Sequence, residues 1–112
     1  MSVLETNLID GLAQVEKTGD IILLIVDHLP WEEPNHLQLL ETKINTALNF
    51  VKSGEVFKKY PHERERVTNH EVKVIFQIAL KYPPNQEADA FLKRCYNILK
   101  SVDIQLECRI KN

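Results

Sequence analysis

The chain has 112 residues, of which 44% are hydrophobic and 27% are charged. This length predicts a single domain over residues 1–112, and the composition excludes a disordered or fibrous protein. The 14 basic and 16 acidic residues give a formal net charge of −2, without the basic excess that phosphate contacts need. We therefore expect neither nucleic acid nor a membrane surface as a partner.

The N-terminal residues, Met-Ser-Val-Leu-Glu-Thr-Asn, show neither the basic nor the apolar region of a signal peptide. The longest apolar run, residues 21–26, is too short to cross a bilayer. Two cysteines, Cys95 and Cys108, are too few for a disulfide framework, and both fall at positions expected to face the core. The sequence thus predicts a cytoplasmic protein with two buried, reduced thiols.

Residues 7–16 form a first predicted strand with weak alternation. Gly19 follows in a Lys-Thr-Gly-Asp turn, where it can adopt the positive φ of a tight hairpin. Residues 21–29 form the second strand, and its run of six apolar residues is typical of a central strand buried on both faces.

A loop at residues 27–35 contains two prolines and leads into a predicted helix at residues 36–52. The helix has one apolar stripe, formed by Leu37, Leu40, Ile44, Ala47, Leu48 and Val51. Asn35 and Gln38 have the spacing of a capping box, and Gly54 is placed to end the helix.

The second half begins with a possible helical turn at residues 55–60 and a charged, exposed connection at residues 61–69. Strict alternation predicts a third strand within residues 70–82. A second helix is expected at residues 86–102, with its stripe formed by Ala88, Phe91, Leu92, Cys95, Ile98, Leu99 and Val102. Residues 104–111 alternate again and predict the last strand.

These elements predict an α+β fold: a two-layer sandwich in ββαβαβ order, with a four-stranded mixed sheet and two helices on one face. The other face is apolar on the second strand, which makes it either an association surface or a surface covered by the N-terminal segment or residues 55–69. A right-handed crossover would make the third strand parallel to the second, but the long connection also allows the antiparallel direction.

The loop after the second strand is the densest group of functional side chains, and the loop at residues 82–85 has the same Pro-Asn sequence before a helix. Ligands tend to bind beyond the carboxyl ends of strands in α/β sheets. If the second and third strands are parallel, the two loops can form one cleft. The candidate ligand- or partner-binding residues are Asp27, His28, Trp31, Glu32, Tyr82 and Asn85.

Metal and catalytic sites are less favoured readings of the same loop. His28, Glu32 and His36 have helical ligand spacing, but Pro30 and Pro34 prevent one helix from carrying all three. Neighbouring strand residues point to opposite faces, so the Asp-His sequence at 27–28 is poorly placed for joint acid–base chemistry. We assign no catalytic residue, metal ligand or cofactor. Trp31 can pack over the core or anchor a partner.

The chain resembles a group of small bacterial proteins catalogued only as a domain of unknown function. The resemblance spans nearly the whole chain and rests on residues 7–10, 17–20, 27–31, 39–45, 53–55 and 81–85. Its most specific elements are Asp-His-Leu-x-Trp at 27–31 and Lys-Tyr-Pro-Pro-Asn at 81–85. The resemblance implies a cytoplasmic α+β protein of this length and no particular activity.

The sequence therefore favours a non-enzymatic protein-interaction module that associates with a protein partner or with itself. One alternative is a small-ligand binder or enzyme that uses the loops at 27–35 and 82–85, with a ligand that the residues do not identify. Another alternative is an accessory immunity-type protein that binds one partner, although a net charge of −2 is slight for that class. A stable dimer would favour the interaction module, whereas the ligand binder or enzyme requires the two loops to be adjacent.

Overall fold

The computed structural model describes residue 6 and residues 9–110, which build one four-stranded sheet in the order β1-β2-β3-β4. The strands are β1 (Gly11–Gln14), β2 (Ile21–Asp27), β3 (Val74–Leu80) and β4 (Ile104–Ile110). The β1 strand is antiparallel to β2, whereas β3 is parallel to β2 and β4 is parallel to β3. The third strand therefore runs in the direction that a right-handed crossover favours.

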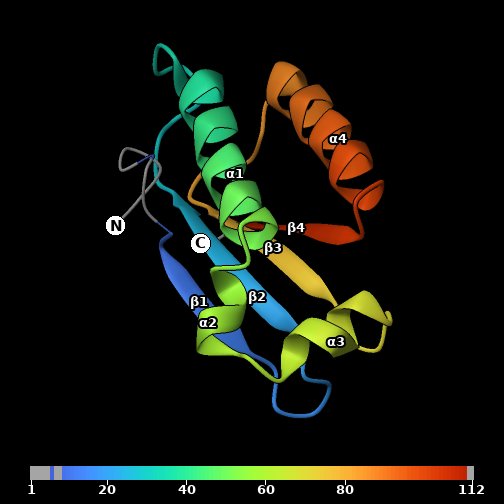
Figure 1. Cartoon of the computed structure of the whole chain (residues 1–112). Helices are drawn as coiled ribbons and strands as arrows, with labels where there is room; N and C mark the ends of the chain where they lie inside the picture. Colours follow the sequence, from blue (N-terminus) through green and yellow to red (C-terminus); the bar gives the residue numbers. More distant parts are fainter. Residues whose placement is uncertain (1–5, 7–8, 111–112) are drawn as a thin grey trace.

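The four helices of the described residues all lie on one side of this sheet (Figure 1). Two are long, α1 (His36–Lys52) and α4 (Gln86–Lys100), and two are short, α2 (Val56–Lys59) and α3 (Glu63–Thr68). The predicted α+β class and ββαβαβ order are confirmed. The connection at 61–69 was expected to be exposed; it contains α3, in which Val67 packs against the core and Glu63 is buried.

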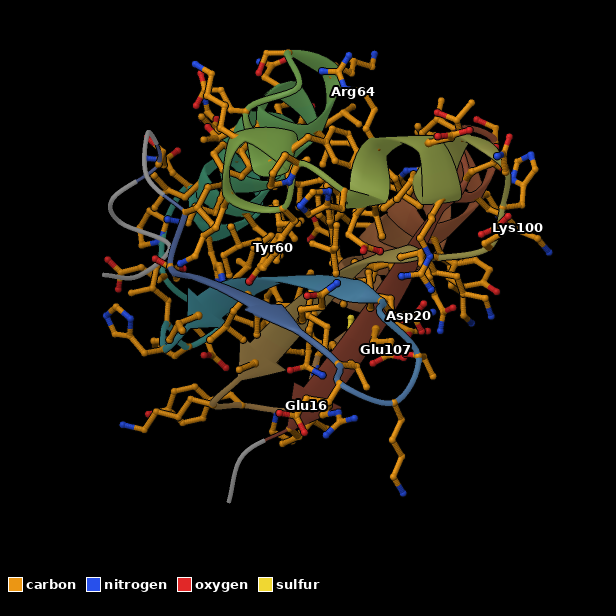
Figure 2. All side chains as sticks on the ribbon, turned by 60° about the horizontal axis from the view of Figure 1, so that its bottom comes forward. Glu16, Asp20, Tyr60, Arg64, Lys100 and Glu107 are labelled. Atoms are coloured by element: carbon orange, nitrogen blue, oxygen red, sulfur yellow. The ribbon has the colours of Figure 1, made fainter. Side chains whose placement is uncertain are left out.

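The core lies between the helices and the helix-facing side of β2 and β3. On that side, alternate residues of both central strands are at most 1% exposed, namely Ile21, Leu23, Ile25, Val74, Phe76, Ile78 and Leu80. Side chains from α1, α2 and α4 complete the core, including Leu40, Val56 and Phe91. Figure 2 shows Tyr60, at the end of α2, between that helix and the sheet, where it packs against the core.

The opposite side of the sheet, here called the open face, is not covered by any helix or strand of the described residues (Figure 2). Strand alternation places nine side chains of β2, β3 and β4 on it: Ile22, Leu24, Val26, Ile75, Gln77, Ala79, Gln105, Glu107 and Arg109. The three β2 side chains are half-buried, and Ile75 and Ala79 of the central strand are 8% and 6% exposed. The open face is therefore apolar over β2 and polar over β4.

Several element boundaries in the structure differ from those predicted from the sequence. The first strand is only Gly11–Gln14, and part of its predicted range, residues 7–8, lies outside the described residues. Gly19 and Gly54 both have φ of 82°, as their turn and helix-end positions predict. The capping box at α1 is wrong: Asn35 adopts a left-handed conformation, with φ of 67°, and its side chain makes no capping hydrogen bond.

The apolar stripe of α4 is only partly buried. Ile98 and Val102 are 62% and 46% exposed, contrary to the expected core positions. Ile98 lines a groove of about 260 Å³ between α1 and α4, so the two helices do not close over each other there. The prediction of two buried thiols is also wrong, since Cys95 is half-buried and Cys108 is exposed on the outer strand, where burial falls off toward the carboxyl end.

Candidate functional site

The loops after β2 and β3 meet at one end of the sheet, because parallel strands bring their carboxyl ends to the same edge. The backbone N–H of Lys81 donates to the carbonyl of Asp27 at 3.0 Å. The indole Nε1 of Trp31 donates to the carbonyl of Tyr82 at 3.1 Å. The adjacency that the ligand-binding alternative requires is thus present, and whether these loops bind a ligand stays a prediction.

Asp27 is paired within the protein. It ends β2 on the helix-facing side, where His36 begins α1, and their side chains are 0% and 2% exposed. His36 Nε2 lies 2.5 Å from Asp27 Oδ2, while the backbone N–H of Leu29 donates to Asp27 Oδ1 at 3.1 Å. Both carboxylate oxygens therefore have partners inside the fold.

Both ring nitrogens of His36 also have polar partners within the protein. Its Nδ1 lies 3.0 Å from the carbonyl oxygen of Pro30, which can only accept, so Nδ1 carries a proton. Nε2 contacts Oδ2 of Asp27, so both ring nitrogens have partners inside the fold. No lone pair of this ring is available for a metal ion or for a substrate proton.

Trp31 covers this pair. Its ring stacks on that of His36, with centroids 4.0 Å apart and planes 13° from parallel. The stacked indole ring shields the buried pair from water. The contacts of Trp31 therefore favour its packing role, while its half-buried state leaves part of the side chain accessible.

The remaining predicted site residues do not converge on this pair. His28 and Glu32 are exposed and make no ion pair or side-chain hydrogen bond within the described residues. Tyr82 is 39% exposed, with Lys81 Nζ 5.6 Å from its ring centroid. Asn85 caps α4 by accepting from the N–H of Ala88 at 2.8 Å, which is a structural task.

A second buried ion pair, between Lys43 and Asp10, was not predicted from the sequence. Lys43 Nζ lies 2.9 Å from Asp10 Oδ1, and the two side chains are 0% and 1% exposed. Asp10 Oδ2 accepts from the N–H of Val26 at 2.7 Å, so this pair joins α1 to the start of β1 and to β2. The signal was present: Lys43 lies between Leu40 and Ile44 on the apolar stripe of its helix.

The thiols are poorly reactive. Burial is the main cause that raises the pKa of both, and for Cys108 the nearby Cys95 thiol and Asp89 raise it further, to about 11. Although the Cys108 residue is exposed, strand alternation turns its sulfur toward the helix layer. Since the thiolate is the nucleophile, both cysteines are largely inert near neutral pH.

The larger of two described cavities lies at the opposite end of the sheet from these loops. It has a volume of about 290 Å³ and is bounded by the end of α3, the end of α4 and the amino ends of β3 and β4. None of the predicted site residues lines it or the groove between α1 and α4. No sequence motif pointed to this cavity, because its lining comes from separate elements.

The described residues contain no group of three or more metal-ligating side chains. Of the conceivable set, His28 and Glu32 are exposed, whereas His36 is buried and already paired. Within residues 9–110 no helix has the length and apolar character needed to cross a membrane.

No curated protein and no solved structure is significantly similar to this chain. A match to a protein family covers residues 1–112, in agreement with the resemblance seen in the sequence. The family is described only as a family of unknown function, DUF6572, so it adds no activity to the geometry above. The chain belongs to this family, DUF6572.

Proposed function

We propose that this protein is a non-enzymatic, cytoplasmic protein-interaction module that works through its open face. The observation that carries this proposal is the uncovered apolar stripe of β2, formed by Ile22, Leu24 and Val26. Parallel strands rarely leave one face of their sheet in water, because their side chains are apolar on both sides. A surface of this kind is typical of an association site.

The buried polar pairs support a non-enzymatic role. Asp27 and His36 use their polar atoms on each other and on the backbone, and Asp10 accepts from Lys43 and Val26. A catalytic acid or base must reach a substrate proton, and these groups are directed into the fold. Their arrangement stabilises α1 on the sheet instead.

The partner that we propose first is a second copy of the chain. The open face has an apolar half on β2 and a polar half on β4, where Arg109 lies 3.9 Å from Glu107. A two-fold axis lying in the interface can set β2 against β2 of the partner copy and leave both polar halves at the rim. This arrangement has the apolar centre and polar border of a stable interface.

The test is solution mass by size-exclusion chromatography with light scattering, over a range of concentrations. We expect a dimer for the natural chain and a monomer for Leu24→Glu, because a carboxylate at the centre of the interface loses its water. Ile98→Glu is the matched control: it adds the same charge at a more exposed apolar residue on the helix side and leaves the dimer intact.

Two outcomes contradict self-association through the open face: a monomer at all concentrations, or a dimer that Leu24→Glu leaves unchanged. In the first case the open face would serve a different protein partner, which the same pair of variants would then test. In the second case the dimer would use another surface, and the open face would lose its proposed role.

A further inference from the structure

We propose that the cavity at the amino ends of β3 and β4 binds a small organic anion that carries a flat apolar group. The cavity of about 290 Å³ is large enough for one ring with one anionic substituent, the lower end of ligand-pocket sizes. It lies at the end of the sheet opposite Trp31, so it is separate from the loops discussed above, and Gln105 is the one lining residue that it shares with the open face.

The apolar part of the cavity suits a planar group. Val67 from α3, Val72 before β3 and Ile104 at the start of β4 contribute aliphatic surface. Tyr96 of α4 also lines the cavity and is 44% exposed, so part of its ring is accessible to a ligand. An exposed aromatic face beside an aliphatic wall can stack on a ligand ring.

The charges around the cavity select an anion. Lys73, Lys100 and His70 line it, with Asp103 as the one carboxylate among its lining residues. The carboxylate lies 3.9 Å from His70 Nδ1, and the two ammonium groups outnumber this single carboxylate. Neither lysine makes an ion pair with any described residue.

Lys100 is also held close to the aromatic surface. Its Nζ lies 6.0 Å from the centroid of the Tyr96 ring. Figure 2 brings this end of the molecule forward and shows Lys100 at its outer edge. A ligand ring on Tyr96 would therefore carry its anionic group next to an ammonium group, which is the geometry of a charge-assisted hydrogen bond.

Two residues that line the cavity have a backbone conformation that is unfavourable for any residue with a side chain. His70 and Asp103 have φ of 61° and 62°, the left-handed region that glycine adopts most readily. Both follow helices, and their N–H groups donate to the carbonyls of Val67 and Lys100 at 3.1 Å, bonds that glycine would make equally well. The backbone thus has no need of these side chains, whereas the cavity uses both as lining.

The ligand anion could be a carboxylate or a phosphate ester, and the experiment separates them. We would titrate the ¹⁵N-labelled full chain with benzoate, phenyl phosphate, inorganic phosphate and benzyl alcohol. We expect benzoate or phenyl phosphate to shift the amides of Val72, Lys73, Ile104 and Gln105. Inorganic phosphate has the anionic group without the ring, and benzyl alcohol has the ring without the charge. Each should bind at least about tenfold more weakly than benzoate or phenyl phosphate.

Variants then test the lining. The double change Lys73→Gln with Lys100→Gln should weaken binding by at least about tenfold. Lys93→Gln is the control on the same helix, since that lysine is paired with Asp89 at 3.1 Å and does not line the cavity; its affinity should match the natural chain. His70→Gly should raise Tm by roughly 3 to 6 °C and still weaken binding.

The gain in stability with a loss of binding is the decisive result, because a misfolded variant cannot produce it. The proposal is overturned if none of the four probes shifts these amides, or if the shifts lie elsewhere. It is equally overturned if the double lysine variant binds as well as the natural chain.

Discussion

At the scale of single residues, the two buried ion pairs decide how α1 lies on the sheet. His36 and Lys43 are seven residues apart, so they share one side of the helix and both face the sheet. Each meets a carboxylate, Asp27 at 2.5 Å and Asp10 at 2.9 Å. A helix shifted by one residue would leave two charges buried without partners, which is far more costly than the pairs themselves.

Lys43→Met tests this directly. The variant keeps an unbranched apolar stem but leaves Asp10 buried without its cation, so we expect a loss of about 3 to 5 kcal/mol in the free energy of unfolding. Urea denaturation followed by circular dichroism measures the loss. The double variant Asp10→Asn with Lys43→Met should recover part of it, since the uncompensated charge is gone. If Lys43→Met alone is as stable as the natural chain, the ion pair with Asp10 does not contribute to stability.

The internal pairing of Asp27 was the part of the site that the sequence did not predict. Asp27 was assigned to ligand or partner binding, and it is engaged by His36, which lies nine positions away across a loop with two prolines. Spacing along the chain cannot pair these residues, because their contact depends on how the loop folds back. The exposed positions of His28 and Glu32 leave their predicted roles untested.

At the scale of elements, two helices begin after the same Pro-Asn sequence and are capped differently. Asn85 is extended and its side chain accepts from the N–H of Ala88. Asn35 has φ of 67° and makes no such bond, and α1 begins with the buried ring of His36. The same Pro-Asn sequence thus precedes two different helix starts, which the local sequence alone does not distinguish.

We expect opposite results from two asparagine substitutions. Asn85→Ala removes a cap and should cost about 1 kcal/mol of stability. Asn35→Gly relieves a left-handed backbone and loses no cap, so it should be neutral or stabilise by up to about 1 kcal/mol. Thermal unfolding of both variants beside the natural chain measures the difference. Equal destabilisation by the two changes would contradict the assigned roles.

Periodicity predicted the positions of the two long helices well because each has one buried side. The bounds of α1 and the start of α4 are those expected from their apolar stripes. Two element-scale features were beyond the sequence. The helix at Glu63–Thr68 is only six residues long and has no complete stripe, and the direction of β3 depends on the path of a long connection, not on its own residues.

At the scale of the whole molecule, the two ends of the parallel strands are built differently. The carboxyl end is closed by Trp31 and by buried, fully paired groups. The amino end holds the cavity, with two lysines and Tyr96 at its lining. Parallel α/β sheets usually place ligands beyond the carboxyl ends, so a site at the amino end departs from that rule. The open face is a third, separate surface, available for protein contact.

The stack of Trp31 on His36 has an optical consequence. Trp31 is the only tryptophan of the chain, and an imidazole ring in face contact, when protonated, accepts an electron from the excited indole. The folded protein should therefore fluoresce weakly and brighten on unfolding, when the rings separate. Because the indole also donates to Tyr82, its emission reports whether β2, α1 and the loop after β3 are assembled. A His36→Gln variant that stays folded and emits as weakly as the natural chain would assign the quenching to another group.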